Sequence, residues 1–175
     1  MDGQNWYQIR KAGPLDLEEA ARVEEECFPA AEAATRESLR QRLEAFWETG
    51  SFLAAVLREN GRMIGFINGA LTDEGTIRDE MFERADLHNP NGAYQSIFGL
   101  DVIGEYRGRG VAAGLMKELI GQARRQGKKG LILTCKKELL GFYEQFGYKN
   151  LGVSASVHGG AVWYDMILEF QDHED

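Results

Sequence analysis

Hydrophobic and polar positions along this chain show two periodicities, one typical of β-strands and one typical of helices. Short apolar or alternating runs predict β-strands, and apolar residues three or four positions apart predict amphipathic helices. The predicted strands are residues 6–11, 52–58, 63–71, 94–103, 131–135, 148–156 and 161–170. The predicted helices are residues 17–27, 35–47, 77–84, 111–123 and 139–146. An Asn60-Gly61 pair between the second and third strands is typical of a tight hairpin turn.

The middle of the chain predicts a parallel crossover. The strand at 94–103, the helix at 111–123 and the apolar run at 131–135 follow each other as one βαβ unit. A short continuous apolar run such as 131–135 suits a strand buried on both faces. The order of elements predicts an α/β fold with a mixed central sheet of about seven strands flanked by helices. We expect a single domain over residues 1–175, with an ordered core at 6–170.

The turn inside this unit carries the clearest chemistry. After the apolar run at 97–103 come Arg107, Gly108, Arg109 and Gly110, and the helical pattern then begins at Val111. The first N–H groups of a helix lack internal partners, and the helix dipole adds partial positive charge there. Glycines allow a ligand to approach the backbone closely, and arginine adds formal charge. The stretch therefore predicts a pyrophosphate site.

Composition narrows the classes of partner. The chain has 175 residues and a net charge of −8, which argues against a nucleic-acid partner. No apolar run approaches the roughly 20 residues of a membrane span, and the first residues carry no apolar signal segment. Cys27 and Cys135, with three histidines, form no metal-spacing pattern, so no metal is expected. We expect a cytoplasmic protein that acts as a monomer or homodimer on a small molecule.

Other phosphate-binding motifs fit this turn less well. Gly108-x-Gly110-x-x-Ala113 nearly satisfies the dinucleotide fingerprint. That fingerprint requires an acidic residue at the end of the next strand to hold the ribose. Here the next strand ends in Thr-Cys-Lys-Lys at 134–137, and the Gly-Lys-Ser/Thr ending of a nucleotide P-loop is absent.

The motif resembles one from a known family. Arg107-x-x-Gly110-x-Ala112 is similar to the acetyl-CoA motif of the GCN5-related N-acetyltransferases (GNAT), and the segment Phe-Tyr-Glu-Gln-Phe-Gly-Tyr at 142–148 lies where that family has its second motif. Within the family the chain looks most like the arylalkylamine (serotonin-type) enzymes. The pointers are Cys-Lys-Lys-Glu-Leu-Leu-Gly-Phe-Tyr at 135–143, Cys-Phe-Pro at 27–29 and His-Gly-Gly-x-x-Trp-x-Asp-Met at 158–166.

The resemblance implies a GNAT acyl-CoA N-acyltransferase fold and acetyl-CoA as cosubstrate. Besides Arg107, the pyrophosphate would be bound by the backbone of Gly108, Arg109, Gly110, Val111, Ala112 and Ala113. The pantetheine would pair with the strand edge at Leu100, Asp101 and Val102, next to a bulge for which Gly99 is suited. Tyr143 matches the family's tyrosine that protonates the leaving thiolate.

The base that removes the amine proton is where this chain departs from its relatives. The vertebrate serotonin enzymes carry two histidines on the central strand, and Ser96 and Phe98 occupy the matching positions here. The resemblance places these two residues, with Phe28, Pro29 and His158, around the amine. The candidate bases, in order, are Glu32, which resembles the glutamate of insect relatives, His158, and His88.

The expected activity is direct transfer of acetyl from acetyl-CoA to a primary amine, an arylalkylamine or a polyamine. Another small amine or a protein N-terminus is the alternative acceptor. A CoA-binding regulatory module without turnover is the alternative from a different class, and an acid at Tyr143 would have no purpose there.

Overall fold

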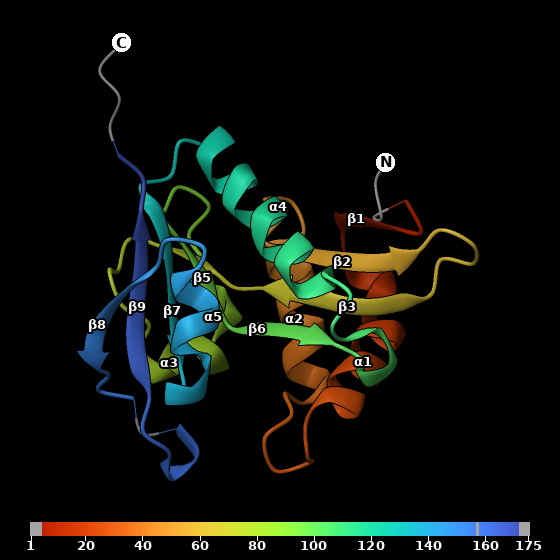
Figure 1. Ribbon diagram of the computed structural model, residues 1–175, viewed down its shortest axis with the longest axis horizontal. Helices are drawn as coiled ribbons and strands as arrows, with labels where there is room; N and C mark the ends of the chain where they lie inside the picture. Colours follow the sequence, from red (N-terminus) through yellow and green to blue (C-terminus); the bar gives the residue numbers. More distant parts are fainter. Residues whose placement is uncertain (1–4, 157, 172–175) are drawn as a thin grey trace. The chain divides into compact units, whose positions relative to one another are not determined.

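The computed structural model describes residues 5–156 and 158–171. Its contacts divide the chain into two compact units (Figure 1). One unit consists of Met1–Gly69 with Gly99–Leu119, and the other of Ala70–Phe98 with Ile120–Asp175. The chain therefore leaves the first unit, enters the second and returns before it finishes in the second.

The first unit contains an antiparallel sheet in the order β1-β2-β3-β6. Its strands are β1 (Tyr7–Lys11), β2 (Phe52–Leu57), β3 (Met63–Asn68) and β6 (Gly99–Val102). Every residue of β2 and β3 is buried. The turn between these two strands uses Gly61 at a φ of 75°, a left-handed conformation that suits glycine.

Helices cover both faces of this sheet. α1 (Leu17–Cys27) contacts β3 and β6, and α2 (Arg36–Phe46) contacts β2. The first half of α4 (Val111–Arg125) packs on the opposite face, where Gly114 lies against Tyr7 of β1 (Figure 1). Thr35 caps α2, because its side-chain oxygen accepts the Ser38 N–H at 3.0 Å.

The second unit contains a mixed sheet in the order β4-β5-β7-β9-β8. Its strands are β4 (Leu71–Thr72), β5 (Tyr94–Ile97), β7 (Gly130–Cys135), β9 (Tyr164–Glu169) and β8 (Lys149–Val153). β5 and β7 are parallel, as the βαβ pattern predicts, and the other pairs are antiparallel.

Short helices complete both units. α3 (Asp79–Glu83) and the residue Ile77 before it pack through Met81 and Ile77 on Ile132 and Ile167 of the second sheet. α5 (Leu140–Glu144) contacts β8. The 3-10 turns are η1 (Pro14–Asp16), η2 (Ala85–Leu87), η3 (Gly104–Tyr106), η4 (Lys137–Leu139) and η5 (His158–Gly160).

The predicted mixed α/β fold is confirmed, but the sheet is split in two. The strand expected over 94–103 breaks at Phe98, between β5 and β6. β5 stays beside β7, while β6 pairs with β3 instead. The strand expected over 63–71 also divides, into β3 and β4, and the last strand begins at Tyr164 rather than at 161.

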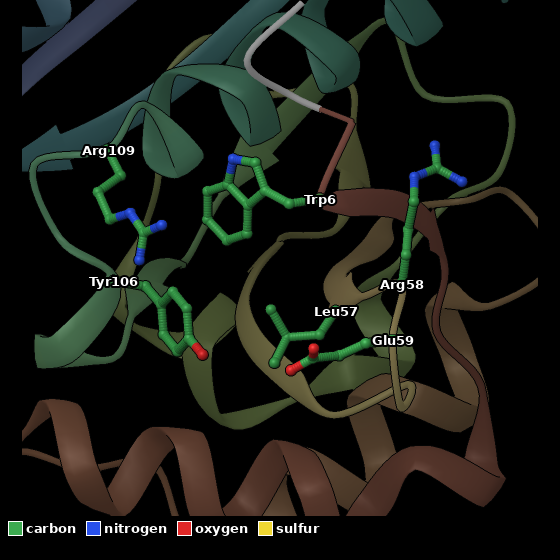
Figure 2. A pocket seen from close by; sticks show the side chains of 6 residues that line it. All are labelled: Trp6, Leu57, Arg58, Glu59, Tyr106 and Arg109. Carbon is green, nitrogen blue, oxygen red and sulfur yellow. The ribbon is translucent and has the colours of Figure 1, made fainter.

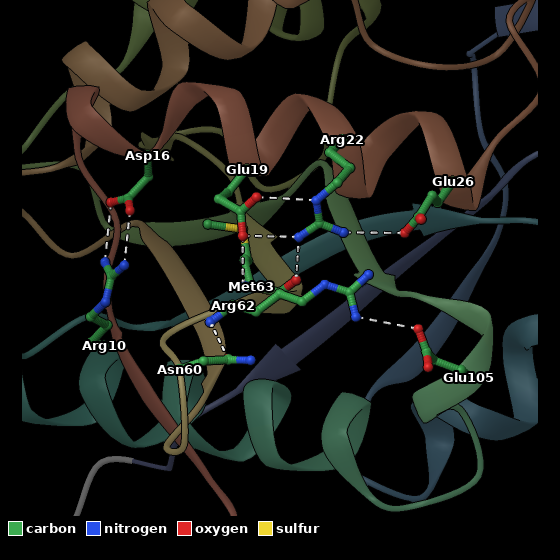
Figure 3. Close-up of polar contacts among 9 residues, drawn as sticks. All are labelled: Arg10, Asp16, Glu19, Arg22, Glu26, Asn60, Arg62, Met63 and Glu105. Atoms are coloured by element: carbon green, nitrogen blue, oxygen red, sulfur yellow. Dashed lines mark hydrogen bonds and ion pairs between the residues drawn. The ribbon is translucent and has the colours of Figure 1, made fainter.

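Polar contacts fix α1 to the start of β3 (Figure 3). Glu19 accepts the Met63 N–H at 3.0 Å, and Arg22 donates to the Met63 carbonyl at 2.8 Å. Arg22 also pairs with Glu19 at 2.9 Å, so the two helix side chains satisfy both backbone groups of one strand residue. The neighbouring pairs Arg10–Asp16 and Arg62–Glu105 lie in the same view.

We expect Glu19→Gln to lower the free energy of unfolding by about 1 kcal/mol near neutral pH, because a charge-assisted hydrogen bond is weakened in a half-exposed setting. Arg22 lowers the pKa of Glu19 below its ordinary 4.5. The stabilisation is therefore complete above about 4.5 and is lost as pH falls through the lower folded value. Denaturant unfolding at several pH values measures this.

The exposed Glu25 on the same helix supplies the control, since Glu25→Gln should leave stability almost unchanged. A deficit in Glu19→Gln that persists undiminished at acidic pH would contradict the role assigned to the ionised carboxylate.

Candidate functional site

A glycine turn joins β6 to the start of α4 in the first unit. After Val102 the chain makes the 3-10 turn η3, and Gly108 and Gly110 then adopt φ angles of 75° and 87°. The Gly114 N–H bonds to the Gly110 carbonyl at 2.9 Å, which starts the helical ladder. The N–H groups ahead of it are the ones that a helix leaves without internal partners. The turn has the geometry that an anion site requires.

β6 presents a strand edge that leads directly into this turn. It is the last strand in the order β1-β2-β3-β6, and its residues pair with β3 on one side only. Among residues 5–156 and 158–171, no strand pairs with the second edge of β6. An edge strand offers its N–H and C=O groups to an extended ligand that carries amides.

The two arginines of the turn differ in their surroundings. Arg107 folds back toward the strand, where its Nε donates to the Val102 carbonyl at 2.7 Å. The Arg109 guanidinium lies 4.4 Å from the Trp6 ring centroid and 5.3 Å from that of Tyr106. Trp6 and Tyr106 stack with their centroids 5.7 Å apart. The aromatic faces thus orient Arg109, whereas the hydrogen bond from Arg107 stabilises the end of β6.

An open cavity of about 500 Å³ lies beside the turn (Figure 2). The lining residues are Trp6, Leu57, Arg58, Glu59, Tyr106 and Arg109. Tyr106 and Arg109 come from the turn, Trp6 directly precedes β1, and the other residues come from the end of β2 and the β2–β3 hairpin. Its walls combine two aromatic rings with two arginines and the carboxylate of Glu59.

Buried polar side chains lie beneath β6, and the sequence analysis missed their importance. Asp101 is 1% exposed, Asn68 of β3 is 0% exposed, and Glu24 of α1 and Arg42 of α2 are buried as well. The sequence predicted a role for Asp101 only through its backbone, at the strand edge that would pair with the pantetheine. The available signals were a carboxylate inside the apolar run at 97–103 and an arginine next to Leu43 on the apolar stripe of α2.

The loop between α1 and α2 carries three of the predicted residues. Phe28 caps α1 and is 37% exposed, and Pro29 and Glu32 are exposed as well. The Ala34 N–H donates to Glu24 at 2.8 Å and ties this loop to the buried polar side chains.

Tyr143 belongs to the second unit. It is buried in α5, with its ring edge-on to Phe142 at 5.1 Å and to Tyr148 at 5.9 Å. Burial raises the pKa of Tyr148 well above 10, and Tyr143 adds to that shift. These packed rings fix the orientation of Tyr143.

Two predicted amine-site residues, Phe98 and His158, meet in an aromatic group in the second unit. Phe82 lies 4.8 Å from Phe98 and stacks on His158 at 6.0 Å, measured between ring centroids. The Trp163 ring lies 6.1 Å from His158, and its Nε1 donates to the His158 carbonyl at 2.8 Å. The group offers flat apolar faces beside one imidazole.

The side chains of Ser96 and His88 both form hydrogen bonds with backbone groups. The buried Ser96 hydroxyl donates to the Ala70 carbonyl at 2.6 Å. His88 Nδ1 accepts the Leu71 N–H at 2.9 Å, and burial, helped by Lys128, lowers the pKa of His88 to about 4. His88 is therefore neutral at pH 7 with one nitrogen engaged, which disfavours it as a proton acceptor.

Residues 5–156 and 158–171 contain no group of three or more His, Cys, Asp or Glu side chains that could hold a metal ion. Within the same ranges, no helix has the length and apolar character needed to cross a membrane.

Comparison with known proteins defines the class. Residues 17–148 match the sequence profile described as "Acetyltransferase (GNAT) family", and the chain belongs to that family. Among curated proteins it is similar to the serotonin N-acetyltransferase of Mesocricetus auratus, with 27% identity over 116 residues. The match covers 66% of this chain and 55% of the relative, so it spans about half the length of that enzyme.

Two solved structures share the fold. The loading GNATL domain of CurA from Lyngbya majuscula has a TM-score of 0.79 and 14% identity, with 94% of this chain and 98% of that chain covered. The GphF GNAT-like decarboxylase in complex with isobutyryl-CoA has a TM-score of 0.76 and 22% identity, with 93% and 98% covered. At these identities the likeness concerns the fold alone.

The turn itself makes a prediction about stability. Gly110→Ala should lower the free energy of unfolding by about 1–2 kcal/mol, because a residue with a Cβ is strained at a φ of 87°. A Cβ at Gly110 would meet no atom within 4 Å, so the backbone strain is the whole effect.

Gly104 lies in the same turn without a positive φ, and a Cβ there also meets nothing within 4 Å. Gly104→Ala should therefore be close to neutral in the same denaturation experiment. Equal losses in the two variants would contradict a conformational requirement at Gly110.

Proposed function

We propose that this chain is an acetyl-CoA-dependent N-acetyltransferase that acts on a primary amine. One observation carries the proposal: the open edge of β6 runs into a glycine turn at the start of α4. Coenzyme A has the matching order of groups, since an extended chain with two amides is followed by a pyrophosphate. Membership of the GNAT family and the similar fold of the GphF decarboxylase, which was solved in complex with isobutyryl-CoA, support this pairing.

In this proposal the backbone carries the cosubstrate. The amides of the pantetheine bond to the strand edge at Leu100, Asp101 and Val102, as an added strand would. The pyrophosphate lies against the N–H groups from Gly108 to Ala113, where the helix dipole favours negative charge. Arg109 adds a cation held over Trp6, while Arg107 keeps the strand end in place through Val102.

The reaction is direct transfer. The neutral amine attacks the thioester carbonyl, a C–N bond forms, and negative charge develops on the carbonyl oxygen, where backbone N–H groups stabilise it. The C–S bond then breaks and the thiolate takes a proton, for which Tyr143 is the proposed donor. No covalent intermediate with the protein is required.

The acceptor is proposed to be an arylalkylamine. The ring faces of Phe82, Phe98, His158 and Trp163 suit an aromatic amine, and the curated relative is a serotonin N-acetyltransferase. A polyamine, another small amine or a protein N-terminus is the alternative acceptor. A CoA-binding module without turnover is the alternative from a different class.

Glu32 and His158, both exposed, are the candidate bases that the family resemblance suggests.

We place the protein in a reducing compartment such as the cytoplasm, where its two free cysteines, Cys27 and Cys135, are stable. It is proposed to act as a monomer or homodimer.

A thiol-release assay tests the function. The protein is incubated with acetyl-CoA and tryptamine, phenethylamine, spermidine or a peptide, and free CoA thiol is followed. We expect the fastest release with an arylalkylamine. Tight CoA binding without thiol release for any amine would favour the non-catalytic module instead.

Tyr143→Phe should lower kcat by about 10²–10³ and leave the KM for acetyl-CoA nearly unchanged, because only the proton donor to the thiolate is lost. The ring and its packing on Phe142 and Tyr148 are retained. Tyr164→Phe on β9 is the control and should retain activity. A rise in KM at constant kcat would assign Tyr143 to binding rather than to proton transfer.

A further inference from the structure

A buried polar cluster lies between the sheet of the first unit and the helices α1 and α2. Asn68 is directly opposite Gly99 in the β3–β6 ladder, and Asp101 is two residues further along β6. Residues opposite each other share a face of the sheet, as do residues two apart on one strand. Asn68, Gly99 and Asp101 therefore share one face.

Two side chains of this cluster, the Asp101 carboxyl and the Asn68 amide, have polar atoms without a conventional hydrogen-bond partner among the described residues. Within the described residues, no N–H or hydroxyl group donates to either oxygen of the Asp101 carboxyl, whose polar neighbour is the Glu24 carboxyl, and neither polar atom of the Asn68 amide has a partner. Both side chains are at most 1% exposed. A buried polar group without a partner costs about 1–3 kcal/mol, so two such side chains on one face of the sheet indicate a binding role.

Gly99 lies next to these polar atoms. A Cβ built there would lie 3.4 Å from Asp101 Oδ1 and 3.6 Å from Asn68 Nδ2. Gly99 and Leu100 are only half-buried, whereas Asp101 and Val102 are buried. Gly99 is therefore the half-buried residue next to the buried Asp101 carboxyl and Asn68 amide.

Titratable and charged groups of α1, α2 and the glycine turn act on Asp101, and the Cys27 thiol of α1 is one of them. Glu24 comes from α1, Arg42 from α2 and Arg107 from the glycine turn. Burial raises the pKa of Asp101 well above its ordinary 3.8, and contact with the Glu24 carboxyl raises it further, while the two arginines oppose the shift. Glu24 is itself anchored by the Ala34 N–H at 2.8 Å.

We propose that Asp101 is the base that takes the proton from the acceptor ammonium, and that the Asn68 side chain holds the same nitrogen over Gly99. This inference rests on the proposed acetyltransferase function and names the proton acceptor that the family resemblance leaves open. An ammonium group carries three donors, and the Asp101 oxygens with Asn68 Oδ1 supply acceptors that no N–H or hydroxyl group of the described residues uses.

The proton balance of the step is complete. One proton passes from R–NH₃⁺ to the Asp101 carboxylate, which leaves a neutral amine with a lone pair. The C–N bond forms and the C–S bond breaks, and the second proton lost by nitrogen balances the one gained by the CoA thiolate. Asp101 then releases its proton to water and is ready for the next cycle.

Burial gives Asp101 a property that an exposed carboxylate lacks. A general base is most effective when its pKa lies near the working pH, and a desolvated carboxyl beside Glu24 is shifted in that direction. Entry of a cationic ammonium favours the ionised form and readies the carboxylate as the ligand arrives. Glu32 and His158 lie at exposed positions instead.

Kinetics of Asp101→Asn test the catalytic part. With tryptamine or spermidine and acetyl-CoA, we expect thiol release near neutral pH to fall by about 10²-fold or more, and the acidic limb of the pH–rate profile to disappear. The KM for acetyl-CoA should stay near the wild-type value. Asp86→Asn, at an exposed ion pair with Arg84, is the matched control and should keep the profile.

A readout independent of turnover tests the site itself. Carboxyl ¹³C NMR of the whole protein, with the Asp101 signal identified by its loss in Asp101→Asn, follows the titration of this group. We expect an elevated pKa that falls when tryptamine is added. Glu24→Gln should lower the pKa of Asp101 in the free protein, and Glu25→Gln, at the exposed neighbouring position, should not.

Asn68→Leu provides a second variant that keeps the carboxyl. It should raise the KM for the amine about tenfold while the acidic limb of the profile remains, because it removes a positioning contact worth about one hydrogen bond. This split between KM and the pH profile separates a positioning role from general loss of structure.

The outcomes separate the two proposals. Loss of the acidic limb in Glu32→Gln, with the limb intact in Asp101→Asn, overturns the assignment of the base. An amine that saturates the protein without changing the Asp101 signal overturns the site. A shifted Asp101 signal without thiol release from any amine supports the site and rejects acetyl transfer.

Discussion

The break in the central strand is the constraint on which the rest of the structure depends. A strand inside a sheet has neighbours on both edges, and β5 has them in β4 and β7. At Phe98 the chain leaves that sheet, and β6 pairs only with β3. The second edge of β6, over the described residues, then has its backbone groups available, and those groups continue into a glycine turn and a helix N-terminus. A continuous sheet would have used the same groups for its own ladder.

The same break places a charged residue in an unusual position. Asp101 follows Gly99 on a strand whose inner face is covered by α1 and α2, so its carboxyl is buried beside Glu24 and Arg42. Burial of unpartnered polar atoms works against stability, and the hydrophobic burial of β2 and β3 in the same sheet offsets that cost. Stability is thus reduced locally at Asn68 and Asp101, as is common for sites that must bind a ligand.

The two arginines of the turn, Arg107 and Arg109, make different contacts although they stand in similar local sequence. Both stand beside glycines, and the sequence suggested the same electrostatic role for each. The Val102 carbonyl at the end of β6 accepts a hydrogen bond from Arg107, whereas Trp6, directly before β1, lies against Arg109. Only the pairing of distant strands brings Trp6 to the turn, and no local pattern encodes that contact.

The sequence by itself determined the local elements, because they depend on periodicity and turn chemistry: the Asn60-Gly61 hairpin, the helix capped by Thr35 and the strand–turn–helix unit that ends at Gly110. It also determined the family, since the Arg107-x-x-Gly110-x-Ala112 motif is local in sequence. Tertiary structure decided the division into two sheets and the burial of Asp101 beside Glu24 and Arg42. Those features arise from pairing and burial between segments far apart in the chain, such as β3 with β6. Hydrophobic periodicity alone does not specify which strands pair.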